Sequence, residues 1–273
     1  MKNKKQKILI STDSIGFFGS SKEFLYLWQD YFEKNFFDGV EMIGLKPLFK
    51  AKKFIRDLKQ KNINIISIHG QTGIIKNLNF FKKSLLRLIN FFIFDYQDLR
   101  KNFPNQELLF HSIYLEEKNI QNQIIKNPPL KLWIENSLTD KNFQELEKTL
   151  KLVDFFQKKG INCAGMIDLY HALSFNQTQE IVDNWFFLFK KLKKYLKYFS
   201  GIHLPIGPRL DDALPLELID DEKIDYLKKE ILSGAERIVI ENPQEYLALI
   251  FSTSQMLKKQ KQRNERILKK LFF

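Results

Sequence analysis

Residues 130–137 of this chain read LKLWIENS, a short apolar run that closes on a glutamate, Glu135. All four histidines of the sequence lie at or just past the end of a similar run. The other runs are 63–70 (INIISIHG), 107–112 (ELLFHS), 163–171 (CAGMIDLYH), 198–205 (YFSGIHLP) and 236–243 (ERIVIENP). Histidine that occurs only where buried strands end indicates a metal site.

Short apolar runs alternate with longer amphipathic segments along the whole chain. The runs are nearly continuous rather than alternating, which is typical of parallel strands covered on both faces. They predict eight strands, at 7–11, 39–43, 63–68, 107–111, 131–135, 163–167, 199–203 and 237–241. Helical periodicity is present at 22–35, 47–60, 76–101, 141–158, 177–198 and 243–252.

Eight strand–helix units in 273 residues predict an α/β fold, a single (β/α)8 TIM barrel. We expect the barrel to span residues 1–253 and a basic amphipathic helix to follow at 254–273. This helix is expected to pack on the barrel or extend from it, with its lysines in solvent. Nucleic acid, an anionic membrane surface or a partner subunit are the alternative ligands for it.

The net charge of +12 has two interpretations. Basic patches recruit polyanions, but here the lysines are spread over helix faces, which favours a lysine-rich composition without such a role.

The single cysteine, Cys163, suits a reducing compartment. The most apolar window, 84–94, is interrupted by Arg87 and Asn90, so we expect no membrane span and a cytoplasmic protein. The oligomeric state stays open.

The polar residues at the strand ends are spaced by about one strand–helix unit. Glu135, Asp168, His203 and Glu241 follow one another at intervals of 33, 35 and 38 residues. Because the carboxyl ends of barrel strands converge on one mouth, we expect these side chains in one pocket with His69, His111 and His171. Three carboxylates in one barrel mouth would repel one another unless a cation neutralised them.

Several segments, in order and on consecutive predicted strands, resemble the xylose isomerase-like TIM barrel superfamily. They are FDGVEMIG (37–44), IHG (68–70), IEN (134–136), MIDLYHA (166–172), GIHL (201–204) and IEN (240–242). This superfamily includes the sugar phosphate isomerases and epimerases and the endonuclease IV-like AP endonucleases of family 2. The resemblance implies a metal quartet of Glu135, Asp168, His203 and Glu241, whose ligand types suit Mn²⁺, Co²⁺, Mg²⁺ or Zn²⁺.

Resemblance to the isomerase and epimerase branch implies proton transfer through an enediolate of a small sugar or sugar phosphate. Glu135 and Glu241 would then be the catalytic acid and base. This branch has a substrate-binding histidine three residues after the metal aspartate and an arginine six after the metal histidine. His171 and Arg209 occupy those positions.

Resemblance to the endonuclease IV branch implies instead a zinc phosphodiesterase that acts at abasic DNA sites, with His69 and His111 as further metal ligands. IENSLTD (134–140) and HLPIGP (203–208) depart from that branch. Asp211 is followed by Asp212 and Ala213, so the histidine expected for a third zinc is missing. A barrel that binds a ligand without catalysis is the remaining alternative. We expect Glu41, in GVEMIG, to have a structural role inside the barrel, with a contact to the site as the alternative.

Overall fold

The computed structural model describes most of the chain. The described residues are 6–12, 20–44, 48–71, 84, 91, 93–137, 142–173, 183–206, 220–241 and 254–272. Two of the predicted site residues, Arg209 and Asp211, lie outside these ranges. So do the predicted helix at 243–252 and most of the predicted helix at 76–101.

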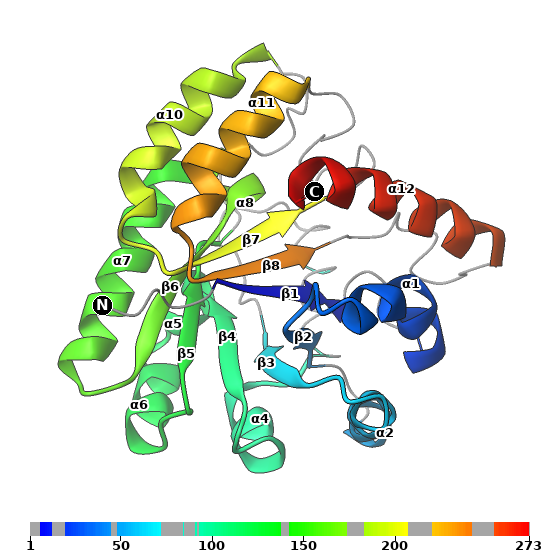
Figure 1. Ribbon diagram of the computed structural model, residues 1–273. Helices are drawn as coiled ribbons and strands as arrows, with labels where there is room; N and C mark the ends of the chain where they lie inside the picture. The colour runs from blue at the N-terminus through cyan, green and yellow to red at the C-terminus, as the bar shows by residue number, and fades with distance from the viewer. Residues whose placement is uncertain are drawn as a thin grey trace.

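The predicted strands form a closed barrel of eight parallel strands in chain order, with β1 beside β8 (Figure 1). The (β/α)8 fold is therefore confirmed, and each strand lies within about two residues of its predicted position. The strands are β1 (Lys7–Ser11), β2 (Gly39–Ile43), β3 (Ile65–His69), β4 (Glu107–His111), β5 (Leu132–Glu135), β6 (Cys163–Asp168), β7 (Gly201–Pro205) and β8 (Arg237–Glu241).

Helices surround the barrel (Figure 1). They are α1 (Ser21–Glu33), α2 (Leu48–Lys59), α4 (Tyr96–Asn102), α5 (Ser112–Leu115), α6 (Lys118–Lys126), α7 (Asn142–Lys158), α8 (Leu169–Leu173), α10 (Trp185–Leu196), α11 (Asp221–Tyr226) and α12 (Ser254–Phe272). A π-helical turn, η3 (Leu227–Ile231), and a 3-10 turn, η4 (Leu232–Gly234), continue α11.

The helix predictions needed two corrections. A continuous helix over 76–101 is wrong, because the chain is not helical at 93–95. There the Asp95 side chain caps α4 by accepting a hydrogen bond from the backbone N–H of Asp98. Helix α6 was missed because its nine residues bury only Ile120 and Ile124, too few apolar positions to show a period. The short helices α5, α8 and α11 were missed because they have only 4, 5 and 6 residues, too few to show a helical period.

The interior of the barrel is apolar along the middle of the strands and polar at their carboxyl ends. Residues two positions apart on a strand face the same side, and all buried residues of the inner cluster except Ala164 lie two positions before a polar residue near their strand end. The inner apolar residues are Leu9, Leu109, Trp133, Met166 and Val239, and those that follow them are Ser11, His111, Glu135, Asp168 and Glu241. The apolar layer therefore forms a floor beneath the polar one.

A partly buried ion pair lies at the amino-terminal end of the barrel. Arg237 Nη2 lies 2.7 Å from Glu107 Oε2, and the same oxygen accepts a hydrogen bond of 2.6 Å from Trp133 Nε1. The Arg237 guanidinium also stacks 4.3 Å from the centre of the Trp133 ring. This pair lies at the opposite end of the strands from the polar layer.

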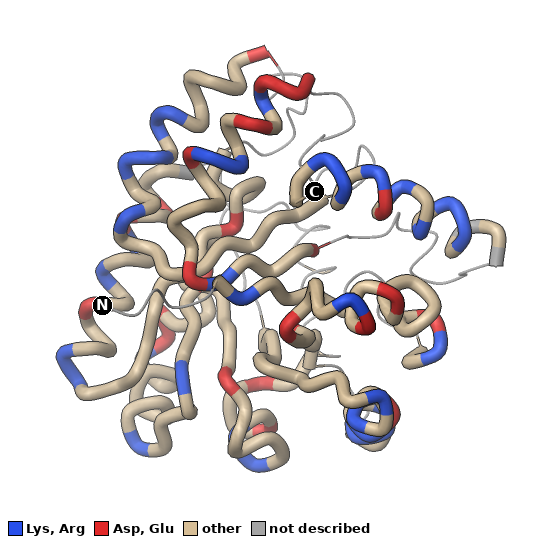
Figure 2. The backbone as a smooth tube through the Cα atoms, viewed as in Figure 1, with Lys and Arg blue, Asp and Glu red and all other residues tan. Residues whose placement is uncertain are grey.

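Helix α12 packs against α1 and α11, where the helix after β8 belongs in such a barrel (Figure 1). Its contact face buries Leu257, Ile267, Leu268 and Leu271. Figure 2 shows Lys and Arg along the rest of this helix, and Lys261 Nζ lies 2.8 Å from Asp30 of α1. None of the helices in the described ranges is long and apolar enough to cross a membrane.

Candidate metal centre

Strand register places the predicted site residues at one level of the barrel. His111 at the end of β4 pairs with Glu135 of β5, and Asp168 at the end of β6 pairs with His203 of β7. Glu241 ends β8 and pairs with Pro205, two residues beyond His203 on β7. Residues far apart in the sequence are therefore neighbours because their strands start and stop together.

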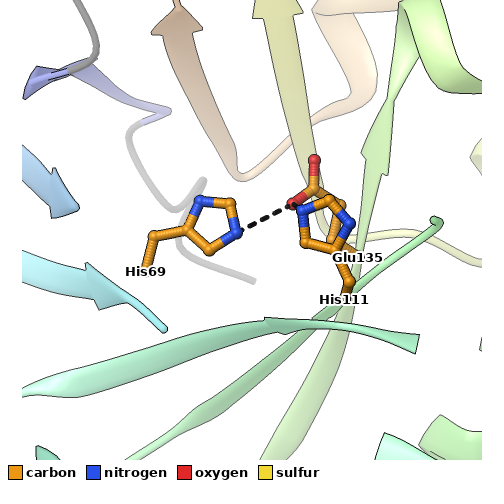
Figure 3. A group of neighbouring side chains, drawn as sticks. All are labelled: His69, His111 and Glu135. Atoms are coloured by element: carbon orange, nitrogen blue, oxygen red, sulfur yellow. Dashed lines mark ion pairs between the residues drawn. The ribbon is translucent and has the colours of Figure 1, made fainter. Parts of the chain in front are cut away.

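Glu135 lies at the centre of the cluster. Its Oε1 is 2.8 Å from Nδ1 of His203. Its Oε2 is 3.3 Å from Nε2 of His111 and 3.7 Å from Nε2 of His69. Figure 3 shows the His69 ring directed at the Glu135 carboxylate, with the His111 ring beside it. One oxygen of the Glu135 carboxylate thus faces His203, and the other faces His69 and His111.

A second carboxylate, Asp168, is held at the start of α8. Its Oδ1 accepts a hydrogen bond of 2.7 Å from the backbone N–H of His171. Asn136 also holds Asp168 in place, because Oδ1 of Asn136 accepts a 2.7 Å hydrogen bond from the backbone N–H of Asp168. Nδ1 of His171 lies 3.1 Å from the Asn136 carbonyl oxygen and 3.8 Å from Asp168 Oδ1. The sequence interpretation missed Asn136, although it follows Glu135 directly in the IEN segment.

The donor atoms of this cluster fit a metal ion. In the described part of the chain, buried side-chain atoms without a hydrogen-bond partner include His69 Nε2 and Glu135 Oε2. Buried polar atoms are rarely left unsatisfied, and nitrogen and carboxylate oxygen atoms are ordinary ligands of divalent cations.

Four groups of three residues each bring one such atom within 4.8 Å of the others. They are His69–His111–Glu135, Glu41–His69–Glu241, Glu135–Asp168–His171 and Asp168–His203–Glu241. The groups share members, so the cluster offers overlapping positions for a cation rather than separate ones.

Burial and mutual charge shift the pKa values of the cluster in opposite directions. Burial lowers the pKa of His203, but Glu135, Glu241 and Glu41 outweigh burial and hold this pKa well above its ordinary value. Burial raises the pKa of Glu135, but His203 and His111 overcome this and hold it below the ordinary range. These shifts favour a proton on His203 and the anionic form of Glu135.

His69, His111 and Asp168 are shifted toward their neutral forms. Burial lowers the pKa of His111 to about 3 and also lowers that of His69. Burial raises the pKa of Asp168 to about 6, although His171 opposes the shift. Neutral imidazoles are the form that binds metal, so His69 and His111 are available as ligands or as hydrogen-bond partners of a substrate.

The structure brings together Glu135, Asp168, His203, Glu241, His69, His111 and His171, as the strand-end pattern predicted. Glu41 joins them. It was expected to have a structural role, yet its Oε1 lies 2.9 Å from Nε2 of His203.

No protein-family model and no curated protein matches the sequence. Solved structures do resemble the fold. The 3-keto-D-glucoside 4-epimerase YcjR from E. coli, in its apo form, has a TM-score of 0.48 at 10% identity, over 97% of this chain and 100% of that one. A xylose isomerase-like TIM barrel/4-hydroxyphenylpyruvate dioxygenase fusion protein has a TM-score of 0.48 at 12% identity, over 97% of this chain. The chain spans 42% of the fusion protein's length.

Proposed function

We propose that this protein is a divalent-metal-dependent isomerase or epimerase of a small sugar or sugar phosphate. One observation carries the proposal: Glu135 Oε1 and Glu241 Oε1 lie 2.8 Å and 3.2 Å from the same atom, Nδ1 of His203. Two glutamates thus lie beside one atom of His203, and Asp168 is in one ligand group with His203 and Glu241 and in another with Glu135 and His171. The quartet implied by the sequence resemblance consists of these four residues.

The reaction needs one group to remove a proton and another to return it. When bound, a divalent cation supplies positive charge that stabilises the oxygens of an enediolate. In the proposed mechanism one of the two glutamates takes the proton from the carbon next to the sugar carbonyl. The other gives a proton to the same carbon from the opposite face, which is epimerisation, or to the neighbouring carbon, which is isomerisation. His171 and Arg209 would orient the sugar hydroxyls or phosphate.

The two glutamates differ in ways that suit different tasks. The Glu135 side chain is 1% exposed and that of Glu241 is 18% exposed. Glu241, at the more open edge of the cluster, has room to reach a bound sugar.

The experiment is a substrate panel with solvent exchange as its readout. Metal-loaded protein is incubated with keto sugars and their phosphates in deuterated water, and exchange at the carbon next to the carbonyl is followed by NMR. We expect exchange and product with one class of sugar, and neither with Glu135→Gln or Glu241→Gln. Exchange that continued in both variants would contradict the assigned proton transfer.

A second candidate function has one specific observation in its favour. Oε2 of Glu135 faces His111 and His69 while Oε1 faces His203, which is the disposition of a carboxylate that bridges two metal ions. Two-metal sites stabilise the attacking and leaving oxygens in phosphodiester hydrolysis. An endonuclease IV-like activity at abasic DNA sites would use such a centre, and the net charge of +12 is compatible with DNA.

Metal content separates the two candidates. Protein purified without chelator is assayed by elemental mass spectrometry. About one Mn, Co or Mg ion per chain supports the isomerase proposal, whereas two or more zinc ions support the phosphodiesterase. In the second case cleavage of a duplex with one abasic site is the activity to test.

A further inference from the structure

Glu41 is a buried carboxylate for which the proposed mechanism has no use. It lies on β2, and its side chain is fully buried together with those of Ser67 on β3 and His203 on β7. A carboxylate is costly to bury unless its oxygens are paired and hydrogen-bonded. Its neighbours therefore indicate what it does.

One oxygen of Glu41 is held by the adjacent strand. The pairing of β2 with β3 shifts by one residue between Val40 and Glu41, so that Val40 pairs with Ile65 but Glu41 pairs with Ser67. Such irregularities redirect a side chain next to functional sites. Here the shift brings the Ser67 hydroxyl 2.8 Å from Glu41 Oε2, to which it donates a hydrogen bond.

The other oxygen of Glu41 faces the imidazole of His203. Glu41 Oε1 lies 2.9 Å from Nε2, while Nδ1 of the same ring faces Glu135 and Glu241. The two nitrogens of His203 thus point to different carboxylates. A histidine that binds a metal through one ring nitrogen commonly donates the hydrogen of the other to a carboxylate, which fixes the tautomer and strengthens the ligand.

We propose that Glu41 is the positioning residue of His203. Its carboxylate is the ion-pair partner of Nε2, so that Nδ1 is reserved for the metal, and Ser67 holds Glu41 in place. The inference rests on the metal centre of the proposed function but not on which reaction that centre performs. It differs from a role of Glu41 as a ligand, for which the group Glu41–His69–Glu241 has the required spacing.

The test compares metal affinities of the wild type and four variants by calorimetric titration of Co²⁺ and Zn²⁺ into chelator-treated protein, with Glu241→Gln as the variant that loses a ligand. Glu41→Met keeps the volume and removes the acceptor, and Glu41→Gln keeps an acceptor oxygen and removes the charge. Glu107→Gln is the matched control, because Glu107 is also a carboxylate of the barrel interior but lies at the opposite end. Circular dichroism and thermal unfolding of each variant establish that it is folded.

We expect Glu41→Met to bind one ion with an affinity lower by about 10–100-fold, with an unchanged stoichiometry. Glu41→Gln should lie between this variant and the wild type, and Glu107→Gln should equal the wild type. The Co²⁺ absorption bands should shift in both Glu41 variants, which a purely structural role would not cause. Equal affinities of the wild type and Glu41→Met would overturn the inference.

The tautomer of His203 is a second readout, because the sequence has only four histidines to assign. A long-range proton–nitrogen NMR spectrum of the Zn²⁺-loaded protein should show His203 bound through Nδ1 with a slowly exchanging hydrogen on Nε2. Binding through Nε2 would overturn the inference.

Different results would contradict the role of Glu41 and the metal centre itself. Loss of the ion from Glu41→Gln as complete as from Glu241→Gln would make Glu41 a ligand and overturn only the inference. A wild-type protein that binds no divalent ion would overturn the metal centre of the proposed function, and the inference with it.

Discussion

Glu135 and His203 are 68 residues apart in the chain and meet inside the barrel, with Oε1 2.8 Å from Nδ1. Both side chains are buried, and each holds the other in its charged form. In the protein without metal the proton on His203 therefore occupies the place that a cation would take. Metal and proton compete for the same pocket.

The first prediction concerns this competition. Because the pKa of His203 is raised, the metal-free protein holds the proton at pH 7, and binding of a divalent ion should release about one proton per ion. Acidification strengthens the proton as a competitor, so the metal affinity should fall as the pH is lowered. Calorimetric titration in buffers of different ionisation enthalpy measures the release. An apparent binding enthalpy that is the same in all buffers would contradict it.

The second prediction concerns the proton transfer. Glu241→Gln should lower kcat by about 10²–10⁴-fold, the usual contribution of a positioned acid or base. We expect the same loss of kcat when the variant is saturated with metal. Steady-state kinetics at several metal concentrations separates this loss from weaker metal binding. Glu107→Gln, which loses a charge at the far end of the same barrel, should keep its kcat within a factor of about two.

The third prediction concerns His111, whose Nε2 is 3.3 Å from Glu135. In a single-metal isomerase His111 contacts substrate, so His111→Asn should leave the metal content at about one ion per chain and raise KM. The measurement is elemental mass spectrometry alongside steady-state kinetics. A fall from two zinc ions to one in this variant would favour the phosphodiesterase instead.

The fourth prediction concerns the carboxyl-terminal helix. Leu268 of α12 is fully buried, and replacement of a buried leucine by alanine costs about 2–5 kcal/mol. Leu268→Ala should lower the free energy of unfolding by that amount, measured by urea denaturation. Lys269→Ala, on the exposed face of the same helix, is the control and should change it by less than about 0.5 kcal/mol. Equal stability of the two variants would mean that α12 adds little to the barrel.

The order and type of the main elements could be predicted from sequence because their signals are local. LWI within KLWIE and IVI within RIVIE are short and continuously apolar, and such runs occur where both faces of a strand are covered. Short helices carry less of this signal, which is why α6, with only Ile120 and Ile124 buried, was missed. The break before α4 depends on one capping side chain, Asp95, within an otherwise helical pattern.

The candidate site was predictable for the residues that end strands, such as Asp168 and His203, because parallel barrel strands deliver their carboxyl ends to one mouth. Glu41 could not be found in this way. It lies in the middle of β2, and only the register shift after Val40 brings it opposite Ser67.

The sequence by itself determined the eight-stranded barrel and the set of side chains that could meet at its mouth, because apolar periodicity and strand-end chemistry are properties of short segments. Only the tertiary structure decided how these side chains share their atoms. Nδ1 of His203 faces Glu135 and Glu241 while Nε2 faces Glu41. That division depends on strand register and ring orientation, which arise when distant segments pack and are not encoded in any one of them.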